Sequence, residues 1–334
     1  MTRAFVTGGS GFVGANLVLA LNERGIAARV LLRPSSSRKA LQGLTYETIE
    51  GDILDDPQRL AGAIEGCDWV FHVAAVADYW RQKQERLYRV NVEGTRNILQ
   101  AARRAGASRL VFTSSLAALG IPQKRGHLLD EEHAFNLPPQ SFPYGHSKML
   151  AEQDVRAASR QGFETVIVNP SIILGPRDVN QISGSLIMQA ALGRLRFIVP
   201  GGANFVDVAD VAAGHIVAAE KGCAGQRYIL GGDNLTYREA IATISEVVGR
   251  DGPRISIPAW LLPPAALAVR VARAVAGNAV PVDDNQVRMM AALIFADSRK
   301  GRSELSLPQT PFKTTVQRTY NWYNQNGYFE RRAS

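Results

Sequence analysis

The sequence predicts an α/β protein in which a doubly wound parallel sheet is followed by a smaller, mostly helical C-terminal domain. Strand candidates alternate with helical stretches through the first half of the chain, which is the pattern of a parallel sheet covered by helices on both faces. The first of these strands runs into a glycine-rich turn. From about Ser171 the alternation gives way to short helices and proline-rich turns, which predicts a second structural region.

The first strand, expected at residues 4–6, leads into the segment "TGGSGFVG" at residues 7–14. A helix is expected over residues 12–24, because the apolar residues have helical spacing and Gly25 follows as a stop. The unpaired N–H groups and the dipole at such a helix start attract an anion, and glycines allow a pyrophosphate to approach closely. We therefore predict a Rossmann-type dinucleotide site, whose first contacts are Gly8, Ser10, Gly11, Phe12, Val13 and Gly14.

Further strands are expected at residues 28–32, 46–50, 69–73, 110–113 and 165–168, with helices between most of them. Residues 121–143 are rich in Pro, Gly and charge and are expected to form a surface excursion. The predicted dinucleotide-binding domain spans residues 1–170, and residues 205–220 return to it. Residues 171–204 and 221–334 are expected to form the substrate-binding region.

Composition indicates a globular protein, because 46% of the residues are apolar and 20% are charged. The formal net charge is +8, but Lys and Arg are interleaved with acids along the chain, so a nucleic-acid partner is not expected. The chain shows no secretory signal and no apolar run long enough to span a membrane, which predicts a cytoplasmic protein. Cys67 and Cys223 lie far apart without a Cys/His cluster, so neither a disulfide nor a metal site is predicted.

One apolar stretch has the pattern of a helix that lies on a membrane surface. The segment "WLLPPAALAVRVARAVAG" at residues 260–277 carries Arg270 and Arg273 among apolar residues. A helix that covers the substrate pocket or forms a subunit contact has the same pattern, and we favour that interpretation. A membrane partner is therefore not expected.

The end of the second strand, "VLLRPSSSRK" at residues 30–39, predicts the type of cofactor. In Rossmann domains that bind NAD, an acidic residue roughly 20 residues beyond the glycines binds the ribose hydroxyls. Arg33 takes that place here, and Arg38 follows on the same loop. Charge-assisted hydrogen bonds from this loop suit a 2′-phosphate, so NADP(H) is the preferred cofactor and NAD(H) is the alternative.

The segment "YGHSK" places Tyr144 and Lys148 four residues apart, on one face of a helix. A neighbouring ammonium and a cationic nicotinamide favour the phenolate, which makes a tyrosine usable as a general acid and base. The strand "RLVFTSS" delivers Ser114 and Ser115 to the carboxyl edge of the sheet, where a hydroxyl can hydrogen-bond a substrate oxygen. These residues would supply a general acid and base beside a hydroxyl that can bind a substrate oxygen.

In this order and spacing the motifs resemble the extended short-chain dehydrogenase/reductase family. Other segments that carry the resemblance are "GDIL" at residues 51–54, "HVAA" at 72–75, "NVEGT" at 91–95, "NPSIILGP" at 169–176 and "FVDVADVAAGH" at 205–215. The resemblance implies that Ser115 polarises the carbonyl, that Tyr144 transfers the proton, and that Lys148 binds the nicotinamide ribose and lowers the tyrosine pKa. It also implies a homodimer, a structural or indirectly catalytic role for Asn91, and cofactor contacts by Asp52, Ile53, Ala74, Ala75, Thr113, Tyr144, Lys148, Pro170 and Ile173.

Within this family the chain resembles dihydroflavonol-reductase-like carbonyl reductases and hopanoid-associated sugar epimerases, through "NPSIILGPRD" and "RYILGG". Nucleotide-sugar epimerases of the family usually carry an arginine where this chain has Ala203 and Asn204. The resemblance therefore favours an NADPH-dependent reductase of a fairly apolar ketone or aldehyde, with an NAD-dependent nucleotide-sugar epimerase or dehydratase as the alternative. A cofactor-sensing protein without activity ranks last, because Ser115, Tyr144 and Lys148 are all present.

The small-molecule substrate is expected to contact residues from both halves of the chain. The predicted contacts are Asp78, Tyr79, Ser115, Leu186 and Phe205, with apolar walls from Ile182, Ile187, Phe197, Trp260, Leu261 and Leu262. Simpler roles are expected for other polar residues. His72 and His215 are expected to pack in the core with hydrogen-bonded rings, and His146 is expected to point away from Tyr144. Asp207 and Asp210 are expected to make loop or helix-cap contacts.

Overall fold

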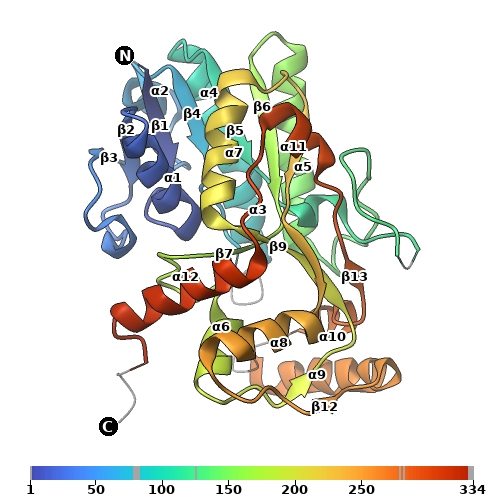
Figure 1. Ribbon diagram of the computed structural model, residues 1–334. Coiled ribbons are helices and arrows are strands. Elements are labelled where there is room, and N and C mark those ends of the chain that lie inside the picture. The colour runs from blue at the N-terminus through green and yellow to red at the C-terminus, as the bar shows by residue number, and fades with distance from the viewer. Residues whose placement is uncertain (1, 78–82, 125, 278–279, 281–282, 330–334) are drawn as a thin grey trace.

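The computed structural model describes residues 2–77, 83–124, 126–277, 280 and 283–329. Figure 1 shows a large twisted sheet between helices and, below it, a smaller part built mainly from the C-terminal half of the chain. Asp78 and Tyr79, predicted at the substrate mouth, lie outside the described residues.

Among the described residues, seven parallel strands form the large sheet, in the order β10-β6-β5-β4-β1-β2-β3. The winding changes direction between β1 and β4, and ligands of doubly wound sheets bind at such a point. The strands are β1 (Arg3–Thr7), β2 (Ala27–Leu32), β3 (Glu47–Glu50), β4 (Trp69–His72), β5 (Arg109–Thr113), β6 (Thr165–Pro170) and β10 (Arg227–Leu230). The strands predicted from apolar runs are confirmed, with ends that differ by one or two residues.

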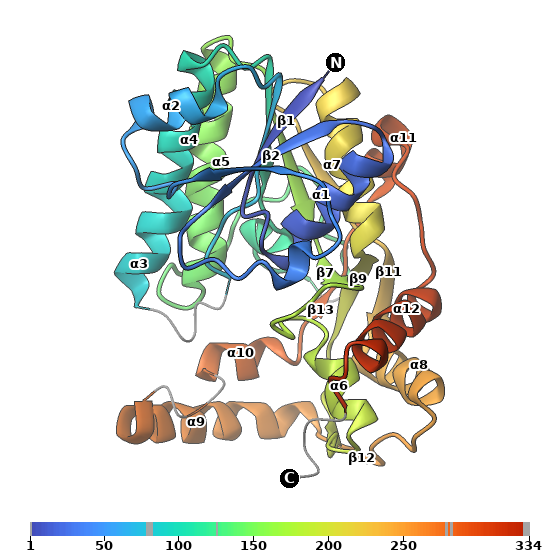
Figure 2. The same ribbon diagram turned by 90° about the vertical axis from the view of Figure 1, so that its left-hand side faces the viewer.

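Helices cover both faces of the large sheet, which is why β1, β5 and β6 are apolar runs rather than alternating sequences. Figure 2 shows α2, α4 and α5 on one face and α1 and α7 on the other. The helices of this part are α1 (Phe12–Glu23), α2 (Pro57–Ile64), α3 (Gln84–Tyr88), α4 (Gly94–Arg104), α5 (Pro143–Arg160), α7 (Val208–Lys221) and α11 (Arg299–Leu305). Two buried apolar clusters, one on each face, hold these layers together.

The strand β10 departs from the expected division of the chain. It belongs to residues 221–334, which the sequence assigned to the substrate region, yet it pairs with β6 at the edge of the large sheet. The helix α11 packs beside β10, where a Cβ on Gly301 would lie 2.7 Å from the Ile229 carbonyl oxygen. The strand is only four residues long and ends at a Gly-Gly pair, so its own sequence gives a weak strand signal.

The smaller part contains a second sheet in addition to the predicted helices. Its central strand is β9 (Gly202–Asp207), which pairs with β7 (Ile172–Leu174), β11 (Asp233–Thr236) and β13 (Leu293–Ile294). A short pair, β8 (Phe197–Ile198) and β12 (Ile255–Ser256), lies at the far end. The helices are α6 (Ser185–Ala191), α8 (Tyr237–Val248), α9 (Leu262–Ala276), α10 (Asp284–Met289) and α12 (Phe312–Gln325).

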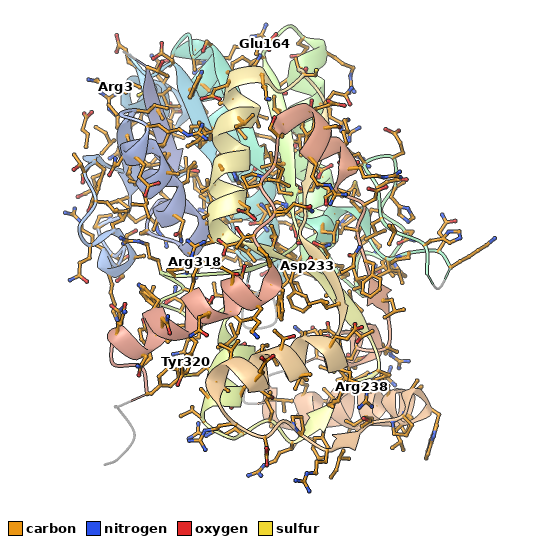
Figure 3. All side chains as sticks on the ribbon, viewed as in Figure 1. Arg3, Glu164, Asp233, Arg238, Arg318 and Tyr320 are labelled. Carbon is orange, nitrogen blue, oxygen red and sulfur yellow. The ribbon has the colours of Figure 1, made fainter. Side chains whose placement is uncertain are left out.

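The helix α12 packs within the smaller part, and through Asp207, the N-cap residue of α7, it reaches the start of a helix of the larger part. Its Arg318 pairs with Asp207 at 3.2 Å, and the N–H of Phe312 donates to Asp233 at 2.8 Å. Figure 3 shows Arg318 and Asp233 between the two parts, with Arg3 and Glu164 at the opposite edge of the large sheet. The carboxyl edge of that sheet therefore faces the smaller part.

The two aspartates at the start of α7 have different roles. Asp207 is the N-cap residue and accepts a hydrogen bond from the N–H of Ala209 at 2.8 Å, as predicted. Asp210 lies inside the first turn and accepts from the N–H of Thr310 at 2.7 Å and from its hydroxyl at 2.8 Å. Asp210 therefore fixes the segment before α12 instead of capping a helix.

The helix α9 lies at the outer end of the smaller part (Figure 2). Of its residues, Leu262 and Ala266 are buried, and they pack against Val287 of α10. Among the described residues, the stretch Ala259–Ala276 is the one helical segment that is long and apolar enough to cross a membrane by length and composition, and 11% of it is buried. This differs from the expectation that no apolar run has the necessary length, because the stretch has that length only when Arg270 and Arg273 are counted within it.

Candidate active site

A cleft of about 1700 Å³ follows the carboxyl edge of the large sheet and continues into the smaller part. Gly8, Ala74, Thr113 and Pro170 line it from the ends of four neighbouring parallel strands. Every predicted cofactor contact lines this cleft except Arg38. Arg38 is exposed and precedes the turn Lys39–Leu41, whose buried residues pack against α1 and take the loop away from the cleft.

The turn between β1 and α1 leaves no room for side chains at its glycines. Gly8 has a φ of +69°, and a Cβ on it would lie 2.6 Å from the backbone nitrogen of Ala74. A Cβ on Gly14 would overlap the Gly8 carbonyl oxygen. The helix starts at Phe12 without a side-chain cap, so its first N–H groups are available to an anion beside the cleft. These residues fit the pyrophosphate of a dinucleotide.

The loops after β2 and β3 line one end of the cleft. Arg33 is exposed there, and its backbone N–H donates to Ser36 Oγ at 3.1 Å. Asp52 Oδ1 accepts the N–H of Leu54 at 3.0 Å, so this carboxylate is engaged in its own turn. The guanidinium of Arg33 therefore gives this end of the cleft a cationic group where NAD-binding domains carry an acid.

Buried polar residues tie the strand ends together under the cleft. His72 is 1% exposed and bonds Thr7 Oγ1 at 2.8 Å and Thr95 Oγ1 at 3.0 Å. Burial lowers the pKa of His72 to about 3, with a smaller contribution from Lys148, so the ring is neutral. Asn91 lies in a π-helical turn, and its Oδ1 accepts the N–H of Val76 at 2.8 Å. These contacts match the hydrogen-bonded packing predicted for His72, and the role of Asn91, structural or indirectly catalytic, stays a prediction.

Two further histidines, His146 and His215, have contacts that agree with their predictions. His215 is fully buried and bonds Thr113 Oγ1 at 2.8 Å and the Val211 carbonyl at 2.7 Å. His146 bonds the hydroxyl of Tyr88 at 2.9 Å.

Ser115, Tyr144 and Lys148 come together in the middle of the cleft. Ser115 follows β5, while Tyr144 and Lys148 lie one turn apart at the start of α5, where Pro143 suits the first helical position. The hydroxyls of Tyr144 and Ser115 share a hydrogen bond. Lys148 Nζ donates to the Thr113 carbonyl at 2.8 Å. The arrangement places a phenol beside a hydroxyl and holds the Lys148 side chain in the same cleft.

Burial sets the protonation of this group of residues. It raises the pKa of Tyr144, and the hydrogen bond with Ser115 lowers it by less. The pKa of Lys148 is lowered to about 7. Burial lowers this pKa, and the negative charge of Glu152 raises it by a smaller amount. The family resemblance implies a lowered tyrosine pKa, whereas burial among the protein's own groups raises it. The phenol therefore stays protonated, which is the form of a proton donor.

A buried carboxylate that the sequence analysis missed lies behind these residues. Glu152 is 2% exposed and accepts hydrogen bonds from Ser114 Oγ and Asn169 Nδ2, both at 2.6 Å. Asn169 Nδ2 also donates to the Ser115 carbonyl at 3.0 Å. The other Glu152 oxygen pairs with Arg227 of β10 at 3.1 Å. The network fixes the backbone of Ser115 and engages the hydroxyl of Ser114, which leaves Ser115 as the serine nearer the chemistry.

The same arginine reaches the surface excursion at residues 121–143. Arg227 donates to the carbonyls of Glu131 and His133, each at 2.6 Å. In the sequence, the hydrogen-bond network around Glu152 is signalled only by the position of Glu152 four residues after Lys148, on the same face of one helix.

The cleft becomes apolar where it enters the smaller part. The apolar lining residues there include Ile182, Leu186, Leu195, Phe197, Phe205, Tyr237, Ile241, Met289 and Met290. Among the described lining residues from Ser171 onward, none has a charged side chain. Ser171 Oγ is buried here and has no hydrogen-bond partner within the described part of the chain.

Four predicted apolar contacts lie elsewhere. Ile187 is buried in the core of the smaller part, between α6 and its neighbours. Trp260, Leu261 and Leu262 are absent from the described lining of the cleft, because their segment packs on the outer side of α10. Helix α10 supplies Met289 and Met290 instead. The helix at residues 260–277 therefore does not cover the pocket.

The position of the expected phosphate-binding arginine lies inside β9. Ala203 and Asn204 are both buried there. Asn204 Nδ2 donates to the Gly232 carbonyl at 3.0 Å, and its Oδ1 accepts the Gly232 N–H at 2.9 Å. This side chain is engaged with the neighbouring strand end.

Residues 4–231 match the NAD dependent epimerase/dehydratase family. The chain is 39% identical over 329 residues to "Putative dihydroflavonol 4-reductase" of Synechocystis sp., which covers 97% of this chain and 95% of that protein. It is 35% identical over 327 residues to "Sterol demethylase protein B" of Methylococcus capsulatus, with 96% and 98% covered. Its fold matches the crystal structure of gox2253 with a TM-score of 0.86 and 35% identity, over 98% of this chain and 99% of that chain.

The doubly wound sheet, the glycine turn and the cleft define a nicotinamide-cofactor enzyme. The chain belongs to the NAD dependent epimerase/dehydratase family. It is an NAD(P)-dependent oxidoreductase of the extended short-chain dehydrogenase/reductase type.

Proposed function

We propose that the protein is an NADPH-dependent carbonyl reductase that acts on a fairly apolar ketone or aldehyde. The observation that carries this proposal is the wall of the cleft beyond Ser115, where the described lining residues from Ser171 onward are uncharged. Such a wall favours a desolvated apolar compound over a strongly hydrated nucleotide diphosphate. The words "reductase" and "sterol" in the names of two relatives agree with a substrate of this class.

The glycine turn at residues 8–14 and the residues that line the cleft beside it would hold the nicotinamide cofactor, which when bound would supply the hydride for the carbonyl carbon. Tyr144 donates the proton to the carbonyl oxygen, because its raised pKa keeps the phenol protonated until negative charge develops on that oxygen. Ser115 shares a hydrogen bond with Tyr144 and orients the same oxygen. Lys148 would hold the ribose beside the nicotinamide, and the Thr113 carbonyl keeps its ammonium at that place.

The preference for NADPH rests on the loop after β2. Arg33, Ser36 and Ser37 line the cleft and offer a guanidinium and two hydroxyls to a 2′-phosphate. A phosphate bound by these groups distinguishes NADPH from NADH, since the ribose hydroxyl of NADH offers no comparable charge.

The test is a substrate panel with purified protein. NADPH or NADH is mixed with alicyclic ketones, aromatic ketones and aldehydes, and the absorbance of the reduced cofactor is followed beside alcohol formation. We expect NADPH to be consumed in step with the alcohol, and we expect nucleotide-sugars to give no thermal stabilisation. Tight binding of a nucleotide-sugar, with NAD retained through purification and no net cofactor turnover, would replace the proposal by an epimerase.

One observation favours that second candidate, a nucleotide-sugar epimerase or dehydratase. Lys83, Arg86 and Arg89 line the cleft on the side of α3, and cations there can bind a diphosphate. Replacing Arg86 and Arg89 with Gln should weaken nucleotide-sugar binding if this candidate is correct, and should leave reduction of an uncharged ketone nearly unchanged if the reductase is correct. A cytoplasmic location and a homodimer stay predictions for both candidates.

A further inference from the structure

Large apolar side chains are exposed together at the outer end of the smaller part. Among the described residues, ten large hydrophobic side chains are exposed, and seven of them belong to β8, β12 and the segment that begins at Trp260. Trp260 is 71% exposed, Val275 87% and Phe197 53%. Figures 1 and 2 both show β12 and α9 at this end of the molecule. Apolar groups gathered in this way mark a binding surface, whereas single ones do not.

The helix α9 has two apolar faces, and helix α10 of the same chain covers one of them. Leu262 and Ala266 are buried against α10. Leu267, Val271 and Val275 recur every four residues, so they share another face, and all three are exposed. We name the exposed residues Phe197, Ile255, Trp260, Leu267, Val271 and Val275 the α9 face.

The two segments that carry the α9 face contain basic but no acidic residues, and acids flank the second segment at Asp251, Asp283 and Asp284. Residues 179–206 and 252–282 contain no Asp or Glu, and their basic residues are Arg194, Arg196, Arg254, Arg270 and Arg273. The nearest acid before the second segment, Asp251, pairs with Arg254 at 3.9 Å. Asp283 caps α10 by accepting the N–H of Gln286 at 2.7 Å. Arginines beside exposed apolar side chains complement a surface of anionic lipid, whose headgroups attract cations and whose acyl region accepts apolar groups.

The α9 face is continuous with the cleft. Phe197 is both part of this face and a lining residue of the cleft. Met290 of α10 lines the cleft and also packs against the buried side of α9. An apolar compound therefore meets apolar side chains from the surface to the site of chemistry.

We propose that the α9 face docks on an anionic lipid bilayer, with α9 lying in the plane of the headgroups, and that the apolar carbonyl substrate enters the cleft from the bilayer. The entry of substrate rests on the proposed reductase, whereas the docking does not. A flat position also suits Arg270, because this side chain reaches the headgroups from it, whereas a crossing helix would place Arg270 within the hydrocarbon. Arg273 lies on the side of α9 that carries Leu262 and Ala266, and it donates to the Val280 carbonyl at 3.3 Å.

The test uses flotation of the full chain with vesicles of phosphatidylcholine containing or lacking phosphatidylglycerol. We expect the protein to float with the anionic vesicles at low salt, and at least tenfold less of it to float with pure phosphatidylcholine or at high salt. The variants Val271→Asp and Val275→Asp change exposed residues and should lower the bound fraction at least tenfold. Leu128→Asp is the matched control, since Leu128 is also an exposed apolar residue but lies in the excursion at residues 121–143. It should bind as the wild type does.

The docking is wrong if the wild type does not float with anionic vesicles at low salt. It is also wrong if Leu128→Asp loses as much vesicle binding as Val271→Asp. A wild-type dimer that Val271→Asp converts to a monomer would instead assign the α9 face to a second copy of the chain. Reduction of a water-soluble ketone by NADPH is measured in parallel and should be the same for Val271→Asp and the wild type. If the wild type reduces no ketone, the proposed function fails irrespective of flotation, so the two failures are distinguished.

Discussion

The carboxyl edge of the large sheet buries polar and charged side chains, whereas the α9 face exposes apolar ones. At the sheet edge charged and polar groups are buried, and Glu152 satisfies its oxygens with Ser114, Asn169 and Arg227. At the α9 face apolar groups are exposed, and the segments that carry them contain arginines but no acids. Buried polar groups keep a precise geometry because each lost contact costs free energy, whereas exposed apolar groups gain free energy only on contact with another molecule. The first region is therefore organised for chemistry and the second for association.

The largest effect should come from the phenol at the sheet edge. Tyr144→Phe removes the proton donor and should lower kcat for ketone reduction by ~100- to 10,000-fold. Steady-state assays with NADPH measure this effect, and circular dichroism checks that the variant is folded. Ser115→Ala should lose a substantial part of the rate, while Ser114→Ala should have a mild effect. A Tyr144→Phe variant with the wild-type rate would remove Tyr144 from the mechanism.

The contrast in burial predicts a contrast in stability. Glu152→Ala leaves Arg227 without its buried partner and should lower the free energy of unfolding by about 3–5 kcal/mol. Val275→Asp, at an 87% exposed position, should change it by only about 0.5 kcal/mol. Urea unfolding of both variants measures the difference. An equally large loss in Val275→Asp would show that the α9 face is covered in the folded protein.

The charge of the loop after β2 should decide between the two cofactors. Arg33→Asp places a carboxylate beside the expected 2′-phosphate, and losing a charge-assisted contact should weaken NADPH binding by roughly tenfold to hundredfold. Binding of NADH should improve or stay unchanged, because a carboxylate can accept the ribose hydroxyls. Fluorescence titration with both cofactors measures this. The preference is wrong if the wild type binds NADH more tightly than NADPH.

The pH dependence should follow Lys148. Its pKa is lowered by burial to about 7, so its positive charge is lost as the pH rises through that value, while the raised pKa of Tyr144 keeps the phenol protonated. We expect kcat/KM for reduction, which reports the free enzyme, to fall by roughly tenfold per pH unit above about 7. An alkaline limb that begins only near the ordinary lysine pKa would contradict this assignment.

The sequence by itself determined the elements whose signals are local. The apolar strands, the glycines at residues 8, 11 and 14, and the spacing of Tyr144 and Lys148 depend on backbone conformation and helix period, which neighbouring residues fix. These elements were enough to predict the doubly wound sheet and the residues that line its carboxyl edge.

Only the tertiary structure decided which surfaces meet. The strand β10 pairs with the distant strand β6, and Glu152 pairs with Arg227, which is 75 positions away in the chain. No local pattern encodes such contacts. The raised pKa of Tyr144 depends on burial by distant segments. The apolar pattern of α9 predicted a helix but not what covers it, because hydrophobic burial is non-directional and the same stripe can face a core, a subunit or a membrane.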